Sequence, residues 1–180
     1  MLPNPLHPAV VHFPVVLAFL LPLFALGALW TIRRGTAPRR AWAVPVALSA
    51  ALALSAWAAV QTGGAQEERV EKIVADQPLN THEDAAELFL TLSGALLLVT
   101  AAGLAGGVVG RSARVLATGG ATALVIMAIN VGHSGGELVY RYGAASAYTE
   151  AGTPNAVRPA IGEGAIAPAA LLTDKRSRAR

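Results

Sequence analysis

The chain has 180 residues and a formal charge of +3, and 54% of its residues are hydrophobic whereas only 14% are charged. This composition excludes an ordinary soluble globular domain. The lack of cysteine excludes disulfides, thiolate metal sites and covalently attached c-type haem. The basic excess does not indicate nucleic-acid binding, because the arginines fall in short loops and in the tail with no aromatic surface between them.

The predicted elements are four apolar segments, each long enough to cross a bilayer at about 20 residues per span. In chain order they lie at about 9–32, 41–60, 84–110 and 114–140. The first is not expected to be a signal peptide, because no positive charge precedes it and its apolar run is too long. Short connections make two helical hairpins, so we predict an all-α integral membrane protein folded as an antiparallel four-helix bundle. No internal sequence repeat is evident.

The other segments are an outer loop and a tail. Residues 61–83 are expected to form an amphipathic outer loop with a short surface helix that Pro78 ends, and Thr81 is expected to cap the third span. The four-span domain then covers residues 1–143. After it the chain is rich in Ala, Gly and Pro without periodicity, so 144–180 is predicted to be a mobile tail.

Charge is distributed unevenly among the connections between spans. The first and third connections carry arginines without acidic partners, namely Arg33, Arg34, Arg39, Arg40, Arg111 and Arg114, whereas the central connection is acidic. The positive-inside rule therefore predicts that both arginine loops are cytoplasmic. We expect a multi-pass protein in the lipid bilayer of the inner (cytoplasmic) membrane, with both termini outside.

All four histidines fall at the predicted outer ends of the spans. They are His7, His12, His82 and His133. Histidine is costly inside a bilayer and is the commonest neutral side-chain ligand for metals, so this convergence predicts a bound group. By depth we predict His12 and His133, which lie further into their helices, as the principal ligands. His7 and His82 are then further ligands or supporting residues.

Two kinds of bound group fit this set. One is a single haem b held by two imidazoles from facing helices and used for electron transfer. The other is a non-haem Zn, Cu or Fe ion held by the histidines together with Glu137 or Glu83. A third interpretation is a structural or accessory membrane subunit whose histidines only satisfy helix ends. No nucleophile or base arrangement demands catalysis, so no catalytic residue is predicted.

The opening HPAVVHFP, the closing GHSGGELVYRYG and the histidine between them resemble a widespread bacterial membrane family, domain of unknown function 2231. The resemblance covers nearly all of residues 6–143. It implies a four-span membrane domain with histidines at the four positions given above. Relatives fused to Rieske-type or cytochrome c-type modules imply electron transfer with a periplasmic or membrane redox protein, and an oligomer is compatible with this role.

Overall fold

The computed structural model describes residues 5–148, and within that range the chain forms helices and no strand. The first span is made of α1 (His7–Val10) and α2 (His12–Arg33), which a turn at Val11 separates. The other elements are α3 (Pro38–Gly64), α4 (Glu67–Val70), α5 (Asp76–Ala102), α6 (Gly107–Tyr140) and the 3-10 helix η1 (Ala144–Tyr148). The four long segments confirm the predicted helical bundle.

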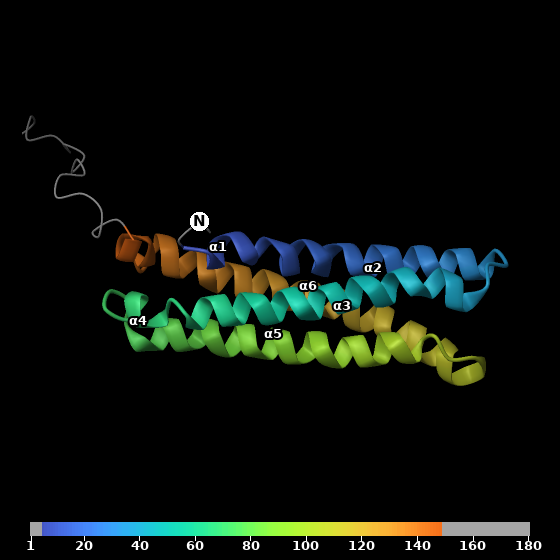
Figure 1. The fold of residues 1–180 in the computed structure, drawn as a ribbon. Helices are drawn as coiled ribbons and strands as arrows, with labels where there is room; N and C mark the ends of the chain where they lie inside the picture. The colour runs from blue at the N-terminus through green and yellow to red at the C-terminus, as the bar shows by residue number, and fades with distance from the viewer. Residues whose placement is uncertain (1–4, 149–180) are drawn as a thin grey trace, which may run out of the picture.

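The long helices run side by side as an antiparallel bundle (Figure 1). Helix α2 packs on α3 and α6, and α5 packs on the same two helices. The α2–α3 and α5–α6 connections lie at one end, whereas α1, α4 and the C-terminal end of α6 lie at the other (Figure 1). All four spans are long and apolar enough to cross a membrane.

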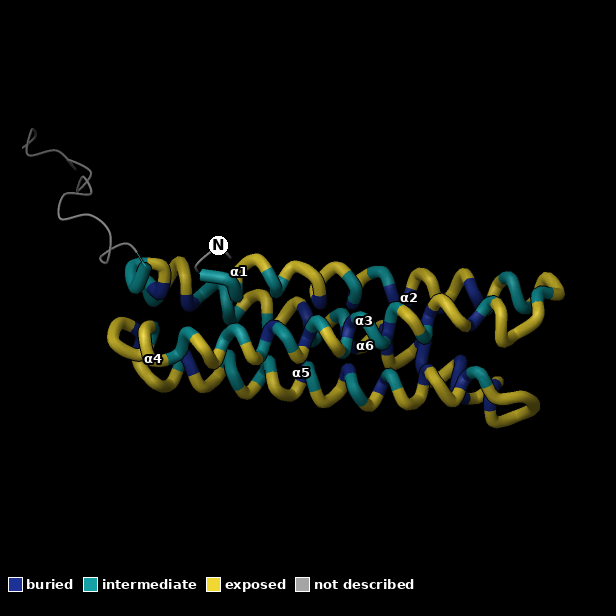
Figure 2. The backbone as a smooth tube through the Cα atoms, viewed as in Figure 1, coloured by how far each residue is buried: buried dark blue, intermediate teal, exposed yellow. Residues whose placement is uncertain are grey.

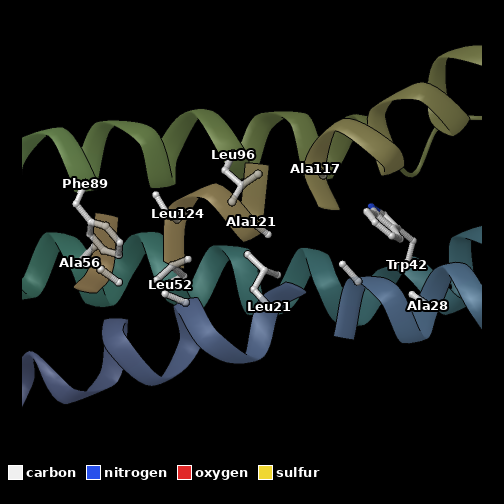
Figure 3. Packing of buried hydrophobic residues seen from close by; sticks show 13 residues of the cluster. Leu21, Ala28, Trp42, Leu52, Ala56, Phe89, Leu96, Ala117, Ala121 and Leu124 are labelled. Carbon is white, nitrogen blue, oxygen red and sulfur yellow. The ribbon is translucent and has the colours of Figure 1, made fainter. Parts of the chain in front are cut away.

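The bundle is apolar on its outside as well as in its core, as a membrane protein requires. Leu98 is 73% exposed and Val108 is 76% exposed, and the exposed positions follow the outer faces of the helices (Figure 2). Inside, one leucine from each long helix meets alanines from its neighbours; these are Leu21, Leu52, Leu96 and Leu124 (Figure 3). Because lipid tails are as apolar as leucine, close packing through small residues holds such helices together.

Helix α5 begins earlier than the sequence indicated. It starts at Asp76, so Pro78 lies in its first turn, where the missing N–H would have no intrahelical partner in any case. The hydroxyl of Thr81 donates to the carbonyl of Gln77 at 2.8 Å inside the helix, so the predicted cap at Thr81 is wrong. Because of this early start, His82 lies more than one turn inside α5.

The same helix also ends earlier, at Ala102, and α6 begins at Gly107. Arg111 and Arg114 therefore belong to α6 and not to a loop. Arg114 is buried, and its guanidinium donates to the carbonyl of Gly103 at the end of α5. A cation at this position suits the negative end of a helix dipole.

A small cap covers the end of the bundle where the histidines lie. Its core is a separate cluster of buried residues: Val74, Leu79, Leu138 and Ala144. The hydroxyl of Tyr148 donates to Oε1 of Gln66 at 2.8 Å, and burial raises the pKa of Tyr148, which keeps this donor protonated. Residues 144–148 are thus packed in η1 and are not part of a tail. The rest of the predicted tail, 149–180, lies outside the described residues.

Candidate functional site

His7 enters the bundle at the start of α1 and meets the last turns of α3. Its Nδ1 atom lies 2.9 Å from the carbonyl oxygen of Ala59 and 3.3 Å from the hydroxyl oxygen of Thr62. A carbonyl only accepts, so Nδ1 carries the proton and donates it to Ala59. Helix α3 thereby fixes the orientation of the imidazole.

His82 occupies a matching position between α5 and α6. Its Nδ1 atom lies 2.9 Å from the hydroxyl oxygen of Ser134, and the carbonyl of Val131 is a further partner of the ring. The hydroxyl of Ser134 donates its own proton to the carbonyl of Val131 at 3.0 Å. The hydroxyl oxygen therefore accepts, and Nδ1 of His82 donates.

The two imidazoles meet at this end of the bundle. The ring centres of His7 and His82 are 6.5 Å apart, and the ring planes are nearly perpendicular at 81°. Both residues are half-buried. The first and third spans, which do not follow each other in the chain, are thus joined through one pair of side chains.

Each ring lies against a glycine of the helix that holds it. A Cβ atom on Gly63 would lie 3.2 Å from Cε1 of His7, and a Cβ on Gly135 would lie 3.0 Å from Cε1 of His82. Both distances are shorter than ordinary van der Waals contact, so any side chain there would press on the ring. The absence of side chains at these two positions lets the imidazoles enter.

The hydrogen bonds also set the tautomer of both rings. Because His7 and His82 each donate from Nδ1, the neutral imidazoles keep the Nε2 lone pair for another partner. Metal-bound histidines in proteins generally have this arrangement, with one ring nitrogen fixed by a second group and the other bonded to the metal. The pair thus has the chemistry of two prepared ligands.

The histidines that we ranked first by depth lie elsewhere. His12 and His133 are exposed on the outer surface of the bundle, and neither makes a hydrogen bond or ring contact with another histidine in the described part of the chain. His133 lines a shallow surface hollow on α6 together with Glu137 and Tyr140. The structure does not bring these two imidazoles into the interior, and the more buried pair is His7 and His82.

The two predicted carboxylate ligands do not reach the histidine pair. Glu137 forms an ion pair with Arg141 at 3.1 Å, one turn along α6. Glu83 lies in an acidic neighbourhood that includes Glu67 and Glu71. Within residues 5–148, no three His, Asp or Glu side chains are close enough together to hold a metal ion.

The residues that hold the rings were only partly visible in the sequence. In the GHSGGE motif Gly135 follows His133 closely in the chain, but it clears space for His82 of another helix. Thr62 and Ser134 looked like ordinary polar residues near a helix end. The signal that marks them is their position on the buried faces of α3 and α6, which include Ala59 and Leu138.

The fold and the site define an integral membrane protein of four spans with a histidine pair at one end of the bundle. The chain matches the family described as "Predicted membrane protein (DUF2231)" over residues 3–148, and it belongs to this family. No curated protein and no solved structure matches it. The match ends at the last residue of η1, so the cap over the histidine end is part of the family's domain.

Proposed function

We propose that the protein binds one haem b through His7 and His82 and serves electron transfer at the outer face of the membrane. The observation that carries this proposal is the pair of imidazoles 6.5 Å apart with both Nδ1 atoms engaged. Two imidazoles bonded to one metal ion at about 2 Å per bond have their ring centres roughly 6 Å apart. His7 and His82 would hold the haem, which would supply one-electron redox chemistry between a reduced and an oxidised redox protein.

The number of available ligands favours haem over a free metal ion. Protein sites for Zn and similar ions use three or four side chains, whereas haem needs only one or two because the porphyrin supplies the other donors. Among residues 5–148 the structure gathers two imidazoles and no third ligand. The rings of His7 and His82 are packed closely against Gly63 and Gly135. For a porphyrin to enter between the rings, the ends of the helices that carry them must therefore move apart.

The charge distribution supports an outward-facing site. The end opposite the histidine pair carries exposed arginines, and the guanidinium of Arg34 lies 5.0 Å from the ring centre of Trp30. The histidine end carries the acidic segment around α4. An excess of arginine marks the cytoplasmic side of inner-membrane proteins, which supports our proposal that the pair faces the periplasm.

The test is the visible spectrum of the full chain purified in mild detergent and titrated with hemin. We expect a Soret band at about one haem per chain. The band should be lost in His7→Gly and His82→Gly, and added imidazole should restore it, which separates ligation from folding. His12→Ala and His133→Ala are the matched controls and should keep the band.

Two results would contradict this function. Wild-type protein that stays colourless at excess hemin would exclude haem. If the band is lost in His12→Ala or His133→Ala and kept in His7→Gly and His82→Gly, the ligands are the exposed histidines and not the inner pair. Stoichiometric Zn, Cu or Fe in colourless protein would support the alternative of a non-haem metal ion.

A further inference from the structure

The two helical hairpins bury matching positions along their whole length. Each buried residue of α3 in the following pairs precedes a buried residue of α6 by the same number of positions in the sequence: Trp42 and Arg114, Pro45 and Ala117, Ser49 and Ala121, Leu52 and Leu124, Ala56 and Ala128. A second constant separation relates buried positions of α2 and α5: Pro14 and Phe89, Ala18 and Ser93, Leu21 and Leu96, Ala25 and Thr100. The helices also have equivalent neighbours, since α2 and α5 each pack on α3 and α6.

The same two separations lead to the histidine pair. The separation found for α2 and α5 relates His7 to His82. The separation found for α3 and α6 relates Ala59, Thr62 and Gly63 to Val131, Ser134 and Gly135, respectively. In both halves the hydroxyl donates to the carbonyl three residues earlier, at 3.0 Å. In both halves the glycine after the hydroxyl residue touches the ring. The agreement thus extends from the backbone register to individual hydrogen bonds.

We infer that the domain is a duplicated helical hairpin, and that Thr62 and Ser134 are equivalent positioning residues of one ligand site lying between the two halves. Each half supplies one imidazole and a hydroxyl within hydrogen-bonding distance of its Nδ1 atom, at 3.3 Å for Thr62 and 2.9 Å for Ser134. The ligand class follows from this arrangement: it would be a metal-containing group that takes one imidazole from each half. This inference deepens the proposed haem site and rests on it for the identity of the ligand.

The two hydroxyls act through the rings and do not touch the ligand. Each hydroxyl donates its proton to a carbonyl of its own helix, so its oxygen can accept a hydrogen bond from Nδ1 of the histidine. Removing the hydroxyl leaves the ring one carbonyl partner, that of Ala59 or Val131. Loss of such a supporting group typically weakens metal affinity about 10–100-fold.

The experiment compares Thr62→Ala and Ser134→Ala in the full chain. Hemin dissociation constants should rise by a similar factor in both variants, within about 10–100-fold, and Thr62→Ser and Ser134→Thr should stay near wild type. Ser55→Ala is the matched control, because its hydroxyl also bonds to a carbonyl three residues earlier but touches no histidine. An effect of one alanine variant without the other would overturn the equivalence.

A second measurement on the unloaded protein does not depend on haem. Nitrogen-15 NMR should find both His7 and His82 in the Nδ1-protonated tautomer, with Thr62→Ala perturbing only His7 and Ser134→Ala perturbing only His82. If hemin does not bind but these signals behave as stated, the proposed function fails and the duplicated site stands. Rings in different tautomers, or insensitive to both variants, would overturn the inference.

Discussion

At the scale of single residues, helical phase decides which histidines face inward. His7 shares a seven-residue stripe with Pro14, Leu21 and Ala28, all of which are buried on α2. His12 shares its stripe with Phe19 and Leu26, both of which are exposed. A seven-residue step returns to nearly the same side of a helix, so His7 follows the core face and His12 the lipid face.

The glycines beside the rings allow a sharp test of this packing. Gly63→Ala and Gly135→Ala place a methyl group 3.2 Å and 3.0 Å from Cε1 of the two histidines, so each ring must move. Gly64→Ala and Gly136→Ala are neighbouring controls, because a Cβ at either position has nothing within 4 Å. We expect the first pair to lower the melting temperature in detergent, by an amount that corresponds to about 1–3 kcal/mol for overpacking.

The controls should match wild type or exceed it, since alanine is the better helix former. Equal melting temperatures for Gly63→Ala and Gly64→Ala would mean that His7 does not lie against α3. The same comparison of Gly135→Ala with Gly136→Ala tests the position of His82 against α6.

The sequence predicted the location of the candidate site along the bundle and not its composition. Depth followed from span boundaries and charge, which placed all four histidines near one end. Which pair faces inward depends on the rotation of each helix about its own axis. In a membrane protein both faces are apolar, so hydrophobicity gives little indication of that rotation. The stripes of small buried residues carry the missing information, since Ala18, Ala25 and Ala56 all lie on core faces.

At the scale of elements, the C-terminal end of α5 is held by side chains from two other helices. The indole N–H of Trp42 donates to the carbonyl of Thr100 at 2.9 Å, and Nε of Arg39 donates to the carbonyl of Leu104 at 3.2 Å. Arg114 donates to the carbonyl of Gly103. Carbonyls at the end of a helix lack the N–H of a following turn, so side chains of the neighbouring helices supply further donors here. The expected span to residue 110 missed this helix end, because the chain stays apolar through the turn.

Close packing at this end leaves no space for a side chain at Gly103. A Cβ atom there would collide with the indole of Trp42, which is fully buried and part of the core cluster (Figure 3). We expect Gly103→Ala to destabilise the protein by about 1–3 kcal/mol in SDS-titration unfolding followed by circular dichroism. Gly119→Ala, where a Cβ meets nothing within 4 Å, is the control and should be neutral or stabilising. A neutral Gly103→Ala would contradict the packing of α3 on α5.

At the scale of the whole molecule, the two ends of the bundle differ in both charge and chemistry. At one end Arg39 and Arg114 bond to carbonyls at a helix end. The other end has the acidic segment around α4 and the histidine pair, together with Arg69 and Arg141. The halves of the duplicated hairpin differ at the arginine end, where Trp42 in α3 corresponds to Arg114 in α6. At the histidine end the corresponding residues keep the same contacts. A bound group held from both halves is a physical reason for the equivalent contacts at the histidine end.

Orientation in the membrane is testable because the chain has no cysteine of its own. Single cysteines at exposed positions, Lys72→Cys near α4 and Ala37→Cys before α3, probe the two ends of the bundle. With the arginine end in the cytoplasm, a membrane-impermeant maleimide should label Lys72→Cys in intact cells and Ala37→Cys only after permeabilisation. Wild-type protein should stay unlabelled in both conditions. The reverse pattern would place the histidine pair on the cytoplasmic side and would contradict the proposed outward-facing site.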